Sequence, residues 1–363
     1  MLHRWTEINL TALRQNVRSI RGRLPRQATF LAVVKADAYG HGARRVAEAA
    51  LEAGAGGVAV STLGEARELA DLVGGDRLLV MGGLLPSDAD LAAETRCAVC
   101  VSNIGMIQAL QSAAAKRGGV ALPVHLKVDT GMGRFGCRPE EAVALSRLIS
   151  AGPDLRLAGV CSHFASADSD SEFTALQLTR FHEVLAEFRT HGLPTGMRHI
   201  ANSAGALRHP EAALDAVRVG IAMYGCEESG VVPVLSLRSR IAHLHTAEQG
   251  ETVGYGTAWR AERRTLVATA TIGYADGVNR SRAGKGWALV RGHRAPLIGR
   301  VSMDAITVDV TEVRKVAVGD TVTLIGADAA ESIRTEDVAA WSGTISYEVL
   351  TAIGKRVTSV STD

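Results

Sequence analysis

The sequence has 363 residues, of which 47% are hydrophobic and 21% charged, and a formal net charge of +2 at pH 7. This composition is typical of a globular protein with room for two domains. The near-neutral charge argues against the basic surface that nucleic acids and anionic membranes require. We therefore expect a small-molecule partner, with no nucleic acid and no membrane.

The first ten residues, MLHRWTEINL, lack a continuous apolar stretch, and no run of 18 apolar residues follows, so we expect neither a signal peptide nor a membrane span. Five cysteines, an odd number, do not suit a disulfide framework and favour the cytoplasm. Cys97 and Cys100 spell C-x-x-C, but they lie in a strand-like run without a second such pair. We interpret them as structural rather than as a redox or metal site, and no metal is expected.

The predicted elements begin with a strand at 5–10, followed by a helix-like stretch. Apolar β-rich runs then alternate with helical segments from residue 28 to about 225, and the runs are 28–34, 57–61, 77–82, 98–102, 122–128, 157–163, 197–201 and 215–220. Apolar stripes mark the helices. The first stripe consists of Ala43, Val46, Ala47, Ala50 and Leu51, and the sixth of Phe173, Leu176, Phe181, Val184, Leu185 and Phe188.

Strands that are apolar on both faces suit a parallel sheet covered by helices. Eight βα repeats predict a (β/α)₈ TIM-like barrel over 11–235. A doubly wound open sheet is the competing arrangement. The lack of a G-x-G-x-x-G after the first strand weakens it only slightly, so the count of eight is the better argument.

The sequence pattern changes after about residue 235, where long helical stripes become rare. Short alternating runs such as 306–311 and 321–326 are separated by Gly-Asp and Asp-Gly turns. We expect a mostly antiparallel β domain at 236–363, which the N-terminal strand within 1–10 joins.

Polar residues follow several barrel strands, where the loops of such a barrel converge on the active site. They are Lys35, Lys127, His163, Ser203 and Arg218. A lysine at the end of a core strand is costly to bury unless it is paired or functional. One such residue could form a salt bridge, but five on the same rim predict a site.

The run AVVKADAYGHG (32–42) resembles the cofactor-lysine signature of the alanine racemases. Further motifs follow in the order of that family: HLKVDTGMGRFG (125–136), SHFASAD (162–168), NSAG (202–205), RVGIAMYG (218–225), VGYG (253–256), GYADG (273–277), GRVSMD (299–304) and ISYEV (345–349). The resemblance covers essentially the whole chain. It implies a fold-type III isomerase dependent on pyridoxal 5'-phosphate, which interconverts L- and D-alanine, supplies D-alanine for the cell wall and works as a homodimer with composite active sites.

The resemblance also implies the two bases. Lys35 would form the Schiff base with the cofactor and act as one base, and Tyr274 of the partner subunit would be the other. Burial and nearby cations lower the pKa of a lysine towards neutrality, whereas a phenol, with an ordinary pKa near 10, needs help to act as a base. His163 and Arg218 resemble the residues that form a hydrogen-bonded network with that tyrosine.

Arg218 carries a separate physical argument. A guanidinium offers only donors, so a pyridine nitrogen that faces it must accept and stays unprotonated. The ring is then a weaker electron sink, which favours racemisation over transamination. The alternative interpretation is an ordinary salt bridge at the rim.

The resemblance assigns the remaining contacts. The phosphate would be held by Tyr39, Ser203, the amides of Gly220 and Ile221, and Tyr347. Arg134 would bind the substrate carboxylate, helped by the Met303 amide of the other chain. Lys127 is often carbamylated in the family, and an unmodified salt-bridged lysine is the alternative. Asp37 and Ser302 stand where many members have Asn and Cys, and we expect tuning rather than loss.

Two other activities remain open. A racemase of broader substrate range would use the same residues. A fold-type III decarboxylase would place a carboxylate near the pyridine nitrogen and a cysteine at the dimer interface, where Arg218 and Tyr274 stand here. A small protein that only binds the cofactor would end at the barrel.

Overall fold

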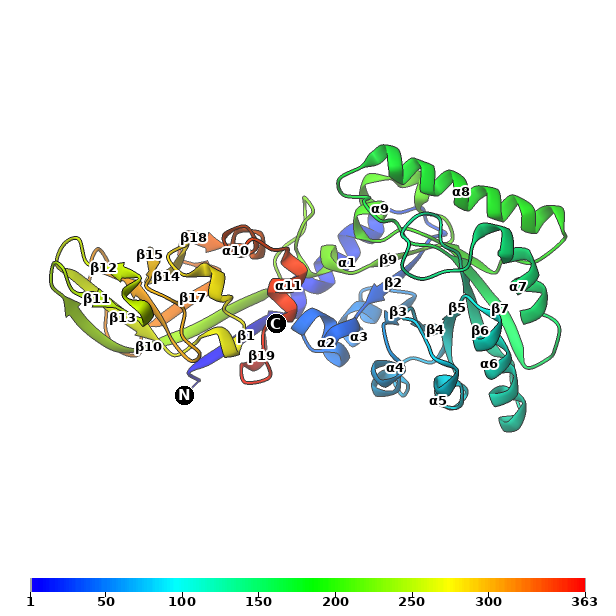
Figure 1. Ribbon diagram of the computed structural model, residues 1–363, viewed down its shortest axis with the longest axis horizontal. Coiled ribbons are helices and arrows are strands. Elements are labelled where there is room, and N and C mark those ends of the chain that lie inside the picture. The colour runs from blue at the N-terminus through cyan, green and yellow to red at the C-terminus, as the bar shows by residue number, and fades with distance from the viewer. Residues whose placement is uncertain (1, 363) are drawn as a thin grey trace. The chain divides into compact units, whose positions relative to one another are not determined.

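The computed structural model describes residues 2–362 (Figure 1), and these divide into two compact units. The barrel unit contains Arg14–Ala38 and Ala43–Met223. The β unit contains the chain up to Leu13, the short segment Tyr39–Gly42, and the chain from Tyr224 onward.

Eight parallel strands form the centre of the barrel unit. They are β2 (Thr29–Val33), β3 (Gly57–Val60), β4 (Gly75–Val80), β5 (Cys97–Val101), β6 (Leu122–Lys127), β7 (Leu155–Cys161), β8 (Met197–His199) and β9 (Ala216–Val219). Their order is β8-β7-β6-β5-β4-β3-β2-β9. The Asp215 amide donates to the Arg198 carbonyl and the Arg218 amide to the Ala201 carbonyl, which joins the two outermost strands. The predicted (β/α)₈ barrel is confirmed, and the open doubly wound sheet is excluded.

Helices cover the outer face of these strands (Figure 1). They are α3 (Ala43–Glu52), α4 (Leu63–Leu69), α5 (Ala89–Thr95), α6 (Ile104–Arg117), α7 (Ala142–Ile149), α8 (Ser171–Thr190) and α9 (Ser203–Arg208), preceded by α1 (Leu10–Gly22) and the short turn α2 (Lys35–Gly40). The stripe predicted for α8 was wrong at Leu176, which is 43% exposed. The buried face that includes Phe181 continues through Gln177 and Thr174, because these polar residues share its phase.

The β unit is mostly antiparallel, as predicted. Its strands are β1 (Arg4–Asn9), β10 (Leu235–Ala247), β11 (Thr252–Val253), β12 (Trp259–Arg260), β13 (Thr265–Ala270), β14 (Trp287–Val290), β15 (His293–Ile298), β16 (Ile306–Asp309), β17 (Thr321–Asp328), β18 (Glu331–Ile333) and β19 (Thr358–Thr362), with helices α10 (Thr335–Ser342) and α11 (Ser346–Thr351). The sheet order is β18-β17-β14-β15-β16-β13-β10-β1-β19, and a further pairing of β17 with β10 closes its middle strands into a ring. Strand β1 pairs antiparallel with β10 and parallel with β19.

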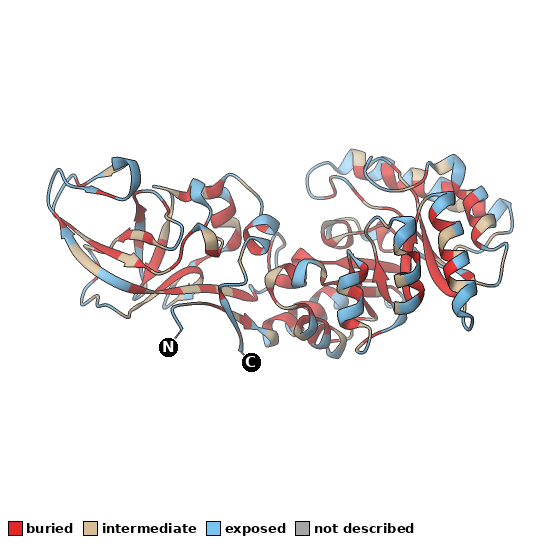
Figure 2. Cartoon of the chain, turned by 60° about the horizontal axis from the view of Figure 1, so that its bottom comes forward, coloured by how far each residue is buried: buried red, intermediate tan, exposed pale blue. Residues whose placement is uncertain are grey.

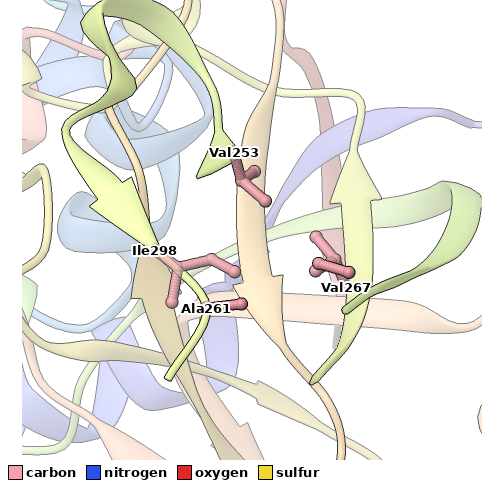
Figure 3. Close-up of a cluster of buried hydrophobic side chains, with 5 residues drawn as sticks. Val253, Ala261, Val267 and Ile298 are labelled. Carbon is pink, nitrogen blue, oxygen red and sulfur yellow. The ribbon is translucent and has the colours of Figure 1, made fainter. Parts of the chain in front are cut away.

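The buried residues of both units are mostly apolar. Figure 2 shows that the exposed residues lie on the outer faces of helices and on loops. One cluster of the β unit packs Val253, Ala261, Val267 and Ile298 together with Ala247 (Figure 3). Trp259 covers this cluster from its half-buried position.

Short 3₁₀ turns connect the larger elements. They are Pro86–Asp88, Pro139–Glu141, Pro210–Ala212, Ile221–Tyr224, Tyr255–Thr257, Tyr274–Asp276 and Arg280–Arg282. Within residues 2–362, no helix has the length and apolar character needed to cross a membrane.

Candidate active site

Lys35 begins a left-handed turn that is separated from β2 by one residue, Val34. The four residues that follow it, from Ala36 to Tyr39, have φ between 51° and 54°. A left-handed helical residue costs about 1–2 kcal/mol when it carries a side chain, so the surrounding structure must hold this turn in place. Glu65 Oε1 accepts a hydrogen bond from the Ala36 amide at 2.6 Å, and Asp37 Oδ1 accepts from the Ala43 amide at 2.7 Å. These two carboxylates fix the backbone that presents Lys35.

A pocket of about 140 Å³ lies at the carboxyl end of the barrel strands. Its lining includes four cationic side chains, those of Lys35, Lys127, Arg134 and Arg218, together with the imidazole of His163. No carboxylate appears among the lining residues, all of which belong to the described chain. A larger cavity of about 400 Å³ at the amino ends of the strands contains none of the predicted site residues. The smaller pocket is therefore the candidate site, and its charge suits an anionic ligand.

The pKa of Lys35 is lowered, mainly because burial penalises the charged amine. The charge of Arg134 is the next largest cause, and Lys127 and Arg218 act in the same direction, while Glu65 opposes them. A lower pKa means that a larger fraction of Lys35 is the free amine at neutral pH. This is the state that a nucleophile or a general base requires.

Arg218, on β9, is buried and has no carboxylate partner among the residues that the structure describes. Its two terminal nitrogens make four hydrogen bonds to neutral acceptors: His199 Nδ1 at 2.5 Å, Ser162 O at 2.8 Å, Ile200 O at 2.9 Å and His163 Nδ1 at 3.0 Å. Within the described chain none of these bonds leaves from Nε. The rim salt bridge considered as an alternative is therefore wrong, and the Nε–H of Arg218 remains available as a donor.

The contacts of Arg218 determine the tautomers of the nearby histidines. Because a guanidinium only donates, His163 Nδ1 must accept, and the proton of the neutral imidazole lies on Nε2. Burial and the charge of Arg218 hold the pKa of His163 well below its ordinary value, so this imidazole is neutral. His199 is neutral for the same reasons, and its Nε2 is 2.8 Å from His125 Nδ1. Each imidazole thus has a defined donor and a defined acceptor.

The loop that carries Arg134 is shaped by Asp129. One carboxylate oxygen of Asp129 accepts hydrogen bonds from the amides of Gly131, Met132 and Gly133, at 2.9 Å, 2.9 Å and 3.1 Å. Gly131 and Gly133 have φ of 140° and 68°, which glycine adopts readily. The guanidinium of Arg134 is exposed and lies 5.8 Å from the ring centroid of Phe135.

Lys127 ends β6 and lines the same pocket. Its Nζ is 3.5 Å from the Met81 carbonyl and 5.4 Å from the ring centroid of Phe135. It makes no ion pair with any described residue of this chain. The structure thus gives no support to the salt-bridged alternative for Lys127.

Ser203 and the segment after β9 lie together. Ser203 Oγ accepts hydrogen bonds from the amides of Gly220 at 3.0 Å and Ala222 at 3.4 Å. The Gly220 amide, predicted to face a phosphate, is thus engaged by Ser203 here. Ile221 lies between these two amides and begins a 3₁₀ turn.

Three aromatic rings of the β unit, those of Tyr39, Tyr224 and Tyr347, lie close together. The ring centroid of Tyr39 lies 5.0 Å from that of Tyr224 and 5.8 Å from that of Tyr347. Burial raises the pKa of Tyr39, so its hydroxyl stays protonated and can donate. The Nδ1 atom of His41 lies 3.0 Å from the Tyr39 carbonyl.

Tyr274 and Met303 lie on two loops of the β unit that are bonded together. The Tyr274 amide donates to the Ser302 carbonyl at 3.0 Å, and the Ala275 amide to the Met303 carbonyl at 3.1 Å. Tyr274 and Met303 are 42% and 52% exposed. The two residues assigned by resemblance to a partner's site therefore share one surface.

Sequence reasoning missed the residues that hold these side chains. His125 lies two positions before Lys127, so strand alternation places both on the inner face of β6. His199 is the last residue of β8, and it lines the same pocket. Glu65 and Asp129 had only weak signals, a capping box at Thr62 and a glycine-rich loop after an aspartate.

Comparison with known proteins gives matches over nearly the whole chain. The family model for the alanine racemase N-terminal domain matches residues 8–228, and the model for the alanine racemase C-terminal domain matches 234–361. An alanine racemase of Desulfovibrio desulfuricans is 39% identical over 364 residues, covering 98% of this chain and 97% of the relative.

Solved structures agree with these matches. An alanine racemase from D-cycloserine-producing Streptomyces lavendulae has a TM-score of 0.94 and 36% identity, covering 100% of this chain and 98% of that one. An alanine racemase of Bartonella henselae, solved with covalently bound pyridoxal phosphate, has a TM-score of 0.89 and 28% identity, covering 100% of both chains.

Proposed function

The chain belongs to the alanine racemase family and is an isomerase, and from this premise we propose that it interconverts L- and D-alanine with two bases, Lys35 and the partner subunit's Tyr274. The observation that carries the proposal is the cationic pocket at the end of the barrel, where Lys35 has a lowered pKa and the hydrogen bonds of Arg218 to described residues all go to neutral acceptors.

Pyridoxal 5'-phosphate fits the residues of this pocket, and the Bartonella henselae relative holds it covalently. The pocket supplies four cations without a lining carboxylate, and the Nε–H of the buried Arg218 has no partner among residues 2–362. Lys35 would hold the cofactor through Nζ, and the phosphate contacts would come from Tyr39, Ser203, Gly220, Ile221 and Tyr347. When bound, the cofactor supplies an electron sink that acidifies the Cα–H bond of the amino acid.

The two bases act on opposite faces of the substrate Cα. Lys35, as a free amine, takes the proton from D-alanine, and its lowered pKa supports that role. The phenolate oxygen of Tyr274 takes the proton from L-alanine. His163 carries its proton on Nε2 because Nδ1 accepts from Arg218, so it can donate to that oxygen and stabilise the phenolate.

Arg218 would limit how far the negative charge that develops on the substrate Cα is delocalised into the pyridine ring. Its Nε–H would donate to the pyridine nitrogen and, because a guanidinium does not give up its proton, would leave that nitrogen unprotonated. The neutral acceptors around Arg218 fix the orientation of its guanidinium plane, and they do not neutralise its positive charge as a carboxylate would. Rapid return of a proton to Cα is then favoured over transamination.

Arg134 and Lys127 act on the substrate carboxylate. Arg134 has no described ion-pair partner in this chain, so its guanidinium is available to a carboxylate. Carbamylation of Lys127 would replace a cation by an anion among three other cations, which favours the modified form and would orient Arg134. The Met303 amide of the partner subunit would complete this contact.

We further propose a homodimer, because Tyr274 and Met303 are exposed on one surface of the protomer. In this arrangement 11–235 binds the cofactor, and 236–363 with strand 1–10 supplies residues to the partner's site. We also propose a cytoplasmic location, with which five free cysteines are compatible. The D-alanine produced would serve cell-wall synthesis.

A decarboxylase is less well supported, since a pocket without a carboxylate lacks the usual partner of a protonated pyridine nitrogen. A broader racemase remains the alternative. The deciding experiment incubates the purified enzyme with a panel of L-amino acids and measures the D form of each by chiral chromatography. Turnover of alanine at least about tenfold above every other amino acid supports the proposal, and absence of D-alanine contradicts it.

A further inference from the structure

Asp276 is a fully buried carboxylate in the β unit, two residues after Tyr274. Its Oδ2 accepts hydrogen bonds from Arg4 Nη1 at 2.9 Å and from the Gly273 amide at 3.0 Å. Its Oδ1 lies 3.3 Å from Arg356 Nε. A buried carboxylate is costly unless ionic partners and hydrogen bonds compensate, so these contacts define where Asp276 and its turn can lie.

The turn that contains Asp276 also contains Tyr274. The Gly273–Asp276 bond closes the 3₁₀ turn Tyr274–Asp276 from its amino end. A Cβ at Gly273 would collide with the carbonyl oxygens of Ser302 and Met303, so the two backbones are in close contact. This explains why a glycine precedes Tyr274 in the GYADG motif.

Arg356 connects the two loops through their carboxylates. Besides Asp276, it pairs with Asp304 through Nη2 at 2.5 Å, and Asp304 directly follows Met303. Arg4 comes from β1, which pairs with β19 beyond Arg356. Asp276 therefore ties the two loops to both ends of the chain.

We propose that Asp276, held by Arg4 and Arg356, is the positioning residue that fixes Tyr274 relative to Met303 for entry into the partner's active site. The inference rests on the proposed function, in which Tyr274 serves L-alanine. Asp276 itself touches no substrate. It acts by limiting the orientations of the phenol before the subunits combine.

The first test uses Cα hydrogen exchange in deuterium oxide, started separately from each enantiomer. Arg356→Gln removes a half-exposed cation from the network, and Asp276→Asn removes the carboxylate itself. Both are expected to slow exchange from L-alanine by at least about tenfold and exchange from D-alanine by less than about twofold, since general bases contribute about 10²–10⁴-fold. Arg264→Gln, which breaks an exposed ion pair with Glu248 in the same unit, is the matched control and should change neither rate.

The second test locates the effect in one subunit. In a heterodimer of a Lys35→Ala chain and a Tyr274→Phe chain, one site has both bases, and its tyrosine comes from the Lys35→Ala chain. Arg356→Gln on that chain should slow the enzyme by about the factor seen from L-alanine. The same substitution on the Tyr274→Phe chain should have no effect.

Equal loss from both enantiomers, or equal loss with the substitution on either chain, would mean that the network is only structural and would overturn the inference. Unchanged rates in folded Arg356→Gln would also overturn it. If Asp276→Asn does not fold, the Arg356→Gln heterodimers still decide. If Tyr274→Phe itself shows no asymmetry between the enantiomers, the proposed function fails, which is a separate outcome.

Discussion

Arg218 Nη2 and His163 Nδ1 lie 3.0 Å apart, with the guanidinium as the donor. This single contact sets the protonation of the imidazole, because Nδ1 cannot carry a hydrogen that faces an arginine. The proton on Nε2 then faces away from Arg218. Arg218 stays charged and, by holding His163 in this tautomer, makes its neutral imidazole a hydrogen-bond donor. The acceptor of that hydrogen bond would be the phenol oxygen of Tyr274, which has to act as a base.

Arg218→Lys should lower kcat/KM for both enantiomers by at least about 10²-fold. A lysine keeps the charge but cannot reach the separate acceptors that a planar guanidinium satisfies, so His199 and His163 lose their common donor. Steady-state kinetics measures the effect, and the control is Arg156→Lys, at an exposed ion pair with Asp76. An Arg218→Lys enzyme within about threefold of the unsubstituted protein would contradict the role of the network.

Borohydride reduction of the holoenzyme should leave the cofactor attached to Lys35. The lowered pKa provides the free amine that the linkage requires, and Lys35 lies at the start of the strained turn. Peptide mapping by mass spectrometry identifies the labelled lysine. Lys127 lines the same pocket and is the internal comparison, so a label on Lys127 would refute the assignment.

Mixing inactive Lys35→Ala and Tyr274→Phe chains should restore activity. One of the two sites in the heterodimer then carries both unsubstituted residues, if Tyr274 serves the partner's pocket as its exposure leads us to expect. The heterodimer is isolated with two different affinity tags and assayed for racemisation. Recovery of about half the activity is expected. No recovery in a verified heterodimer points to a site built within one chain.

Tyr274→Phe should slow Cα exchange from L-alanine in deuterium oxide while largely preserving exchange from D-alanine. Without the hydroxyl only Lys35 remains as a base, and a base on one face serves one enantiomer. The loss from L-alanine is expected to be about 10²–10⁴-fold, as is typical for general acid–base groups. Equal loss from both enantiomers would require abandonment of the two-base account.

The unfolding free energy should fall as the pH drops below about 6.5, in part through His125. Burial lowers the pKa of His125 in the folded protein to about 4, so between these values the unfolded chain binds a proton that the folded chain does not. This stabilisation is complete above the unfolded pKa and is lost towards the folded pKa, at about 1.4 kcal/mol per pH unit.

His125→Asn should reduce that pH slope by about one proton, because an amide oxygen can still accept from His199 without titrating. Urea unfolding at several pH values between 5 and 7.5 provides the measurement. His191→Asn, at an exposed position, is the control and should keep the slope of the unsubstituted protein. An unchanged slope in His125→Asn would show that His125 titrates alike in both states.

The barrel could be predicted from the sequence because most of its parallel strands contain a continuous apolar run and alternate with helices that have apolar stripes. Every predicted barrel strand overlaps an observed one, from β2 to β9. The polar residues at the strand ends were recognisable for the same reason, since a charge there interrupts an apolar run. The stripe on α8 failed at Leu176 because Gln177 and Thr174 are buried polar residues, and hydrophobicity alone does not reveal them.

The contacts that hold those residues come from the tertiary structure and have no local signal in the sequence. Glu65 reaches the Ala36 amide 29 positions away, and Arg4 reaches Asp276 across 272 positions. Local sequence patterns predict which segments are apolar and which form turns, because secondary-structure preferences depend on residues that are close in the sequence. A hydrogen bond between distant residues depends on where the whole chain brings them. The residue types at the site could therefore be predicted from the sequence. The tautomers of its histidines and the contacts that hold the Tyr274 turn could not.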